Sequence, residues 1–318
     1  MKIDSKGNII VGSMAILITS ILLISIFVFT SVTYIENQNI DSEISDTFRY
    51  IIDDYSNNIE VLGRSSIEDA SEKVYHSFKL FNSRDQIKKN LDNKLAEKNM
   101  EFAEKYDIKI SSETLSVENT ATPWKVLFKV KLNVEKDNEK FANVIEKNVS
   151  IEGLKDPLPP AILTVAGGMG MHGDKIHYGN ALTRYLWLHH TDSAESYLFA
   201  TAPLTIKKCP YDPYIHHGDY GVLKDCLDKG YFHESADGSC YLCRLEGKGK
   251  CPHYGMEVFI QTHTPLNNGS VSCSDHVVFH DHYSGEKLNK LDLNSLILDS
   301  SHMKKYGLDG EGMNETIL

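Results

Sequence analysis

The feature that most constrains this chain is an uncharged apolar stretch over residues 9–34, with the sequence IIVGSMAILITSILLISIFVFTSVTY. A helix needs about 20 residues to cross a hydrocarbon core about 30 Å thick, and it satisfies its own backbone groups in lipid. The apolar part of a cleaved secretory signal is shorter, about 7–15 residues, and is followed by small residues. The sequence therefore predicts a retained transmembrane anchor over residues 8–34.

The charges that flank this stretch predict its orientation. Lys2 and Lys6 precede it, and the first charged residues after it are all acidic, namely Glu36, Asp41, Glu43 and Asp46. Because positive flanks stay in the cytoplasm, residues 1–7 are expected inside the cell and residues 35–318 outside. The prediction is a single-pass protein of the cell membrane, with the lipid bilayer as a partner. A net charge of -11 disfavours nucleic acid as another partner.

Residues 35–106 carry the apolar periodicity of amphipathic helices. Side chains spaced three and four apart form one stripe, which comprises Ile44, Phe48, Ile51, Tyr55, Ile59, Leu62, Ile67, Ala70, Val74, Phe78, Ile87, Leu91, Leu95 and Phe102. Gly63 is expected to end a first helix, with Ser65 or Ser66 capping the next. The segment is interpreted as a largely helical stalk that continues from the anchor.

The periodicity changes to two over residues 107–158, where a small antiparallel β unit is predicted. Alternate residues of one strand are apolar, namely Val126, Phe128, Val130, Leu132 and Val134. Three prolines within residues 153–160 cannot continue a strand ladder, so a domain boundary is placed there. The predicted fold class is α+β: a transmembrane helix, a helical stalk, this sheet, and a loop-rich head with short strands.

The head, residues 159–303, holds all six cysteines and 13 of the 14 histidines, and a flexible tail is expected over residues 304–318. Six cysteines in an exported domain predict three disulfides. The alternative is a structural zinc site, because a C-x2-C-x7-C-x-H pattern offers three thiolates and one imidazole. Its candidate ligands are Cys240, Cys243, Cys251 and His253. No other cofactor is expected.

The histidines raise a catalytic alternative. Residues 275–282 read DHVVFHDH, and His276, His280 and His282 with nearby carboxylates resemble the ligands of a catalytic metal. No HExxH motif or spaced carboxylate pair accompanies them. The sequence therefore predicts no catalytic and no cofactor-binding residues.

The chain resembles type IV pilin-like proteins. The resemblance rests on a short start ending in Lys6-Gly7, the apolar stretch, the helical segment and a β-rich end. Three stretches also resemble uncharacterised archaeal, methanogen-type surface proteins, namely VSIEGLKDPL (149–158), RLEGKGKCPHYGMEVFI (244–260) and SCSDHVVF (272–279). The resemblance implies a class III signal, cleavage after Gly7 by a prepilin-type signal peptidase, and other pilin-like subunits as partners. Pilins place a glutamate five residues after the cut, where this chain has Gly12.

The function expected from these features is that of a non-enzymatic, outward-facing surface protein, either pilin-like or a component of the cell envelope or of adhesion. Two alternatives remain open. One is an anchored zinc-dependent hydrolase, and the other is an extracellular ligand-binding or sensor domain that acts through a partner.

Overall fold

The computed structural model describes residues 18–25, 45–77, 79–163, 168–189, 194–262, 273–279, 288–290, 296–308 and 314–316. The chain divides into two compact units. One comprises residues 1–54 and 136–139, and the other comprises residues 55–135 and 140–318.

In the first unit, helix α2 (Asp46–His76) begins directly after Ser45. The Ser45 hydroxyl accepts a hydrogen bond from the backbone N–H of Phe48 at 3.2 Å, as an N-terminal cap does. The same hydroxyl donates to Glu139 at 2.7 Å, and the Ser45 backbone N–H also donates to that carboxylate. Glu139 therefore fixes the start of the helix to the start of strand β3 (Glu139–Ser150).

The predicted transmembrane anchor is not supported. Of residues 8–34 the structure describes only 18–25, which are helical, and the others lie outside the described residues. Nowhere in the described part of the chain is a helix both long enough and apolar enough to cross a membrane. The long helices that are described carry charges throughout their length, as in SRDQIKKNLDNKLAEKNMEFAEKY. The predicted location depends on this anchor and is not supported either. It comprised a single-pass position in the cell membrane, a cytoplasmic N-terminus and an extracellular bulk.

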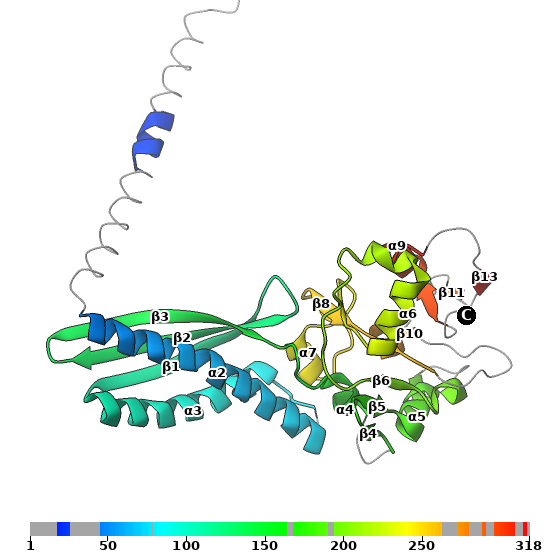
Figure 1. Ribbon diagram of the computed structural model, residues 1–318, viewed down its shortest axis with the longest axis horizontal. Helices are drawn as coiled ribbons and strands as arrows, with labels where there is room; N and C mark the ends of the chain where they lie inside the picture. Colours follow the sequence, from blue (N-terminus) through cyan, green and yellow to red (C-terminus); the bar gives the residue numbers. More distant parts are fainter. Residues whose placement is uncertain are drawn as a thin grey trace, which may run out of the picture. The chain divides into compact units, whose positions relative to one another are not determined.

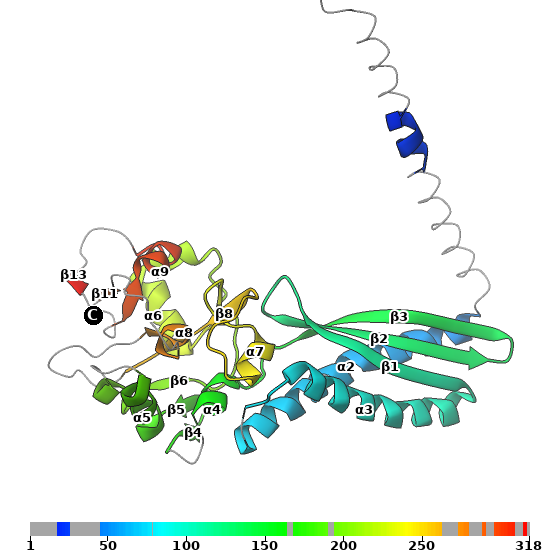
Figure 2. The ribbon, with the colours of Figure 1, turned by 180° about the vertical axis from the view of Figure 1, so that it is seen from behind.

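The second unit begins with helices that pack on a sheet. Helix α3 (Ser83–Tyr106) lies along the sheet formed by β1 (Lys109–Asn119), β2 (Lys125–Lys136) and β3, in the order β1-β2-β3 (Figures 1 and 2). Strands β1 and β2 pair antiparallel, with Val117 opposite Phe128. The alternating apolar face of β2 is buried, as its period of two predicts.

Gly63 does not end a helix, because α2 continues through it to His76. A side chain at this position would come close to the sheet: a Cβ would lie 3.1 Å from Val149 Cγ2 and 3.3 Å from Phe128 Cε2. Ser66 does not cap a new helix either, since its hydroxyl donates to the carbonyl of Leu62 one turn earlier. The glycine therefore serves close packing of helix on sheet.

The remaining elements are short. The helices and 3-10 turns are α4 (Leu158–Ile162), α5 (Gly179–His189), η2 (Ala194–Tyr197), η3 (Tyr214–Gly218), α6 (Tyr220–Lys229), α7 (Tyr241–Leu245), α8 (Asp275–Val278) and α9 (Ser300–Lys305). The strands are β4 (Gly170–His172), β5 (Lys175–His177), β6 (Thr201–Pro203), β7 (His233–Ser235), β8 (Gly255–Glu257), β9 (Phe259–Ile260), β10 (Cys273–Ser274), β11 (Leu288–Lys290), β12 (Ile297–Asp299) and β13 (Asn314–Thr316).

These strands form small antiparallel sheets, β4-β5-β6, β7-β8, β10-β9 and β12-β11-β13. The predicted fold class is therefore corrected: the described chain consists of helices and several small antiparallel sheets, without a transmembrane helix. Two apolar clusters support this region. One surrounds Tyr178, Leu182 and Ile260, and the other surrounds Leu227, Phe259 and Tyr306. Strands of two or three residues bury little surface, so they need other sources of stability.

The close approach at Gly63 leads to a first prediction. Replacing Gly63 by Val should destabilise the chain by about 1–3 kcal/mol, because the added methyl groups overpack the contact with Val149 and Phe128. Urea unfolding of the full chain measures the change. Asn57→Val, at an exposed position of α2, is the matched control and should change stability by less than about 0.5 kcal/mol. Equal effects of the two substitutions would contradict the packing role of Gly63.

Candidate metal centres

Among the described residues, three groups of side chains are arranged so that they could bind a metal ion, and all three lie in the second unit. Each member offers one ligand atom, and within a group these atoms lie within 4.8 Å of one another. The first group comprises Cys209, His217, Cys226 and His233, the second Cys240, Cys243, Cys251 and His253, and the third Glu257, His276 and His302. The structure therefore contains Cys/His clusters that could bind a metal ion, which agrees with the zinc alternative drawn from the sequence.

The first group draws its ligands from one connecting segment and three elements. Cys209 lies before η3, which carries His217, while Cys226 lies in α6 and His233 opens β7. The backbone N–H of Cys209 donates to the carbonyl of Phe232 at 2.9 Å, which places it beside β7. All four side chains are buried. The segment with Cys209, the turn η3, helix α6 and strand β7 thus bring their ligand atoms together at one buried place.

Three of the printed spacings among these four ligand atoms are close to the edges of a zinc tetrahedron, and the fourth, 3.0 Å between Cys226 Sγ and His233 Nε2, is shorter. Two sulfurs bound to one zinc ion lie about 3.8 Å apart, two nitrogens about 3.3 Å, and a sulfur and a nitrogen about 3.5 Å, given Zn–S of about 2.3 Å and Zn–N of about 2.0–2.1 Å. Here Cys209 Sγ and Cys226 Sγ lie 3.9 Å apart, and the Nε2 atoms of His217 and His233 lie 3.2 Å apart. Cys209 Sγ is 3.5 Å from His217 Nε2.

The hydrogen bonds around the first group leave its ligand atoms available. His217 donates from Nδ1 to the carbonyl of Tyr214 at 2.7 Å, so its Nε2 is left without a proton when the ring is neutral. Burial lowers the pKa of His233, which keeps that ring neutral. The Cys226 thiol donates to Cys209, and this bond, with His217 and His233 nearby, lowers the pKa of Cys209 to about 3. The same bond raises the pKa of Cys226.

The second group is the C-x2-C-x7-C-x-H pattern. Cys240 caps α7 and Cys243 lies within it, and Gly247, with φ of +70°, turns the chain back toward Cys251 and His253. His253 Nδ1 lies 3.6 Å from Cys240 Sγ and 3.5 Å from Cys243 Sγ, again close to the sulfur–nitrogen edge of a zinc tetrahedron.

Two features favour metal binding by the thiolates of the second group. Cys251 Sγ accepts a hydrogen bond from the backbone N–H of Cys240 at 3.3 Å, an interaction that favours the thiolate. Hydrogen bonds from Cys240 and Cys243 lower the pKa of Cys251, and the bonds of Cys243 to Cys240 and Cys251 raise the pKa of Cys243. Three thiols that share protons in this way ionise readily when a cation replaces the protons.

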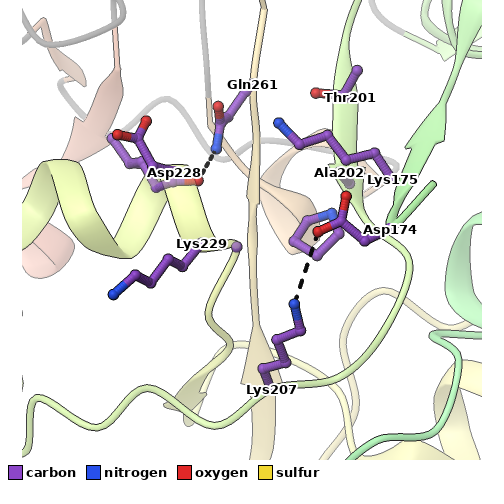
Figure 3. A pocket seen from close by; sticks show the side chains of 11 residues that line it. Asp174, Lys175, Thr201, Ala202, Lys207, Asp228, Lys229 and Gln261 are labelled. Carbon is purple, nitrogen blue, oxygen red and sulfur yellow. Dashed lines mark hydrogen bonds and ion pairs between the residues drawn. The ribbon is translucent and has the colours of Figure 1, made fainter. Parts of the chain in front are cut away.

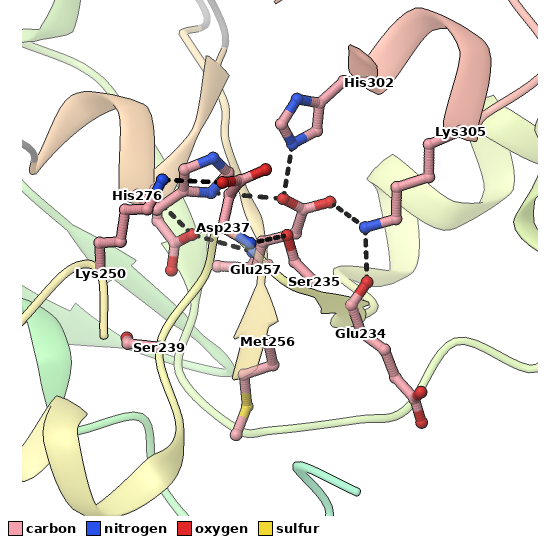
Figure 4. Close-up of polar contacts among 12 residues, drawn as sticks. Glu234, Ser235, Asp237, Ser239, Lys250, Met256, Glu257, His276, His302 and Lys305 are labelled. Atoms are coloured by element: carbon pink, nitrogen blue, oxygen red, sulfur yellow. Dashed lines mark hydrogen bonds and ion pairs between the residues drawn. The ribbon is translucent and has the colours of Figure 1, made fainter. Parts of the chain in front are cut away.

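The third group lies where β8, α8 and α9 meet (Figure 4). Glu257 Oε2 is 2.7 Å from His302 Nε2 and 3.3 Å from His276 Nδ1. Its other oxygen, Oε1, accepts hydrogen bonds from Lys305 at 2.5 Å and from the Tyr306 hydroxyl. Burial alone would raise the pKa of Glu257, but Lys305 and His302 hold it well below its usual range.

A buried ion triad connects the second and third groups. The Arg244 guanidinium, fully buried, donates from Nε and Nη2 to the two oxygens of Asp156 at 2.7 and 2.6 Å, and from Nη2 to Asp275 Oδ2 at 2.6 Å. Arg244 follows Cys243 in α7, and Asp275 precedes His276 in α8. Asp275 also accepts from the backbone N–H of Val258, next to Glu257. The triad therefore fixes the positions of the second and third groups relative to each other.

A polar pocket between the β5–β6 edge and the end of α6 is not a comparable site (Figure 3). Asp174 pairs with Lys207 at 3.9 Å, and the Gln261 amide donates to the carbonyl of Leu227. None of the residues that line this pocket is a cysteine or a histidine.

The structure brings together all four candidates predicted from the sequence, Cys240, Cys243, Cys251 and His253. The predicted disulfides find no pair among the cysteine side chains that are described. These are all free, namely Cys209, Cys226, Cys240, Cys243 and Cys251. In the catalytic alternative, the structure places His276 beside Glu257 and His302. The other two candidates, His280 and His282, lie outside the described residues.

Sequence reasoning missed the first group, and of the third group it named only His276. Cys209, His217, Cys226 and His233 are separated by seven, eight and six residues, and no short motif has this spacing. The alternation of Cys and His along this segment is the one signal that could have revealed it. Glu257 and His302 are 45 residues apart, so only the fold brings them together.

No family model, curated protein or solved structure matches the chain. The resemblance to type IV pilin-like proteins stays a prediction.

The triad around Arg244 leads to a second prediction. Arg244→Met should lower the free energy of unfolding by about 3–5 kcal/mol, because it leaves the carboxylates of Asp156 and Asp275 buried without their partner. Urea unfolding of the full chain measures the loss. Arg184→Met, which removes an exposed arginine of α5, is the control and should have little effect. A loss below about 1 kcal/mol for Arg244→Met would contradict the role given to the triad.

Proposed function

We propose that this protein is a non-enzymatic scaffold whose Cys/His-rich region is held together by two structural zinc ions. One would be bound by Cys209, His217, Cys226 and His233, and the other by Cys240, Cys243, Cys251 and His253. The observation that carries the proposal is the spacing of the ligand atoms. Three distances in the first group and two in the second agree with the edges of a zinc tetrahedron, and one in the first group, Cys226 Sγ to His233 Nε2, is shorter at 3.0 Å.

The choice of zinc follows from the donor sets. Two thiolates with two imidazoles, and three thiolates with one imidazole, are combinations that structural zinc sites use. Calcium and magnesium prefer oxygen ligands, of which neither group has any. Copper also binds thiolate and imidazole, but tetrahedral sulfur–nitrogen sites are typical of zinc.

The structural role follows from the number of ligands. Four protein ligands complete the coordination of zinc, so neither ion would keep a position for water or substrate. Structural zinc contributes free energy to folding directly, about 10–16 kcal/mol in small zinc-binding peptides. Such a contribution suits a region whose strands are two or three residues long. A rigid region of this kind fits a structural or binding component, and the pilin-like or adhesive role remains a narrower prediction.

Metal analysis of the full chain, purified with reductant and zinc, tests this proposal. We expect at least two zinc ions per chain, with one lost in Cys226→Ser, a different one lost in Cys243→Ser, and two lost in the double variant. His216→Ala, which removes an exposed histidine beside His217, is the matched control and should keep the full zinc content.

Cadmium-113 NMR distinguishes the two sites without a substitution. The cadmium-loaded chain should give two separate resonances in the thiolate range, because one ion has two sulfur ligands and the other has three. A zinc-free protein whose thiols are all consumed as disulfides would overturn the proposal, as would a zinc content that neither cysteine substitution changes.

A further inference from the structure

The third group, Glu257, His276 and His302, differs from the two zinc sites in composition and in number of ligands. Its members are all buried, with exposed side-chain fractions of 0 % for Glu257, 7 % for His276 and 4 % for His302. They come from β8, α8 and α9, so three separate segments converge on one carboxylate (Figure 4). The imidazole rings of His276 and His302 are stacked, with centroids 5.1 Å apart.

The two oxygens of Glu257 have separate roles in this arrangement. Oε1 accepts from Lys305 and Tyr306, and Oε2 faces both imidazoles. A carboxylate that binds a metal through one oxygen commonly has its other oxygen hydrogen-bonded in this way. Lys305 and Tyr306 therefore orient the carboxylate and leave Oε2 directed at the two rings.

A network of ion pairs alone does not explain the position of the His276 ring. Its Nδ1 is buried, lies 3.3 Å from Glu257 Oε2, and makes no hydrogen bond. A buried nitrogen that makes no hydrogen bond costs about 1–3 kcal/mol. A cation between Nδ1, Oε2 and His302 Nε2 would give this nitrogen a partner, since the three atoms already lie within 4.8 Å of one another.

We propose that Glu257 Oε2, His276 Nδ1 and His302 Nε2 bind a third, divalent transition-metal ion. Two imidazoles and one carboxylate are the ligands of catalytic zinc sites and of non-haem iron(II) sites, both of which keep open positions. With three protein ligands, this ion keeps at least one coordination position for water or a small anion. It therefore has an exchangeable ligand, which the two closed sites lack.

Cobalt(II) titration of the full-length, metal-free chain tests the proposal. Wild type should bind three ions. Two of them should show thiolate-to-cobalt charge transfer, and the third should contribute only weak d–d absorption. His276→Ala and His302→Gln should each bind two ions and keep the charge-transfer bands, which report that the rest of the region still folds. Lys304→Ala, an exposed change on α9, should still bind three.

Azide tests the open position. It should change the d–d absorption of wild type and leave the charge-transfer bands unchanged, and it should have no effect in His276→Ala. Two cobalt ions in wild type would overturn the proposal, as would three ions in both histidine variants. Either result would leave the two thiolate sites intact, so failure here is distinguishable from failure of the zinc scaffold.

Discussion

The buried guanidinium of Arg244 is the interaction on which the Cys/His-rich region depends. It contacts Asp156, at the end of the segment that leaves the three-stranded sheet, and Asp275, at the start of α8. Asp156 in turn accepts from the backbone N–H of Leu158, and its carbonyl accepts from the Tyr75 hydroxyl of α2. One side chain thereby joins three segments that are far apart in sequence. Buried charges are costly unless they are paired and hydrogen-bonded, and these are both.

Strand β8 connects Arg244 to the three candidate metal-binding groups. Ser239, which precedes Cys240, bridges to Met256, and His233 lies opposite Glu257 in the β7–β8 pair. The three groups are therefore neighbours in the fold. Tyr306 donates to Glu257 and packs against His233, with ring centroids 5.1 Å apart. Helix α7 is also fixed to the helical part of the unit, because Glu246 accepts from the backbone N–H and hydroxyl of Ser83 at the start of α3.

Much of the helix and sheet packing could be predicted from periodicity. The stripe of α3 and the alternation of β2 each report which face is buried, since those faces meet each other locally. Gly63 was misread because glycine is a weak helix former, and sequence does not show that a strand approaches there. The apolar stretch over residues 9–34 was read from its composition alone, and the structure describes no helix that could span a membrane.

The sites were predictable only where their ligands are close in sequence. Cys240, Cys243, Cys251 and His253 form a compact pattern on one helix and one turn, so their spacing carries a signal. The sequence gives no comparable signal for the contacts of Arg244 with Asp156 and Asp275, because these residues are far apart in the chain and only the tertiary structure brings them together. Residues 149–158, 244–260 and 272–279, the three stretches singled out in the sequence, contain these residues, and in the fold the three stretches meet at Arg244.

The central claim is that metal ions rather than disulfides hold this region together. X-ray absorption at the zinc edge of the full-length protein tests it most directly. The account predicts a first shell with sulfur neighbours at about 2.3 Å and nitrogen neighbours at about 2.0–2.1 Å. A zinc shell without sulfur, or a protein that retains no zinc when purified with it, would contradict the account.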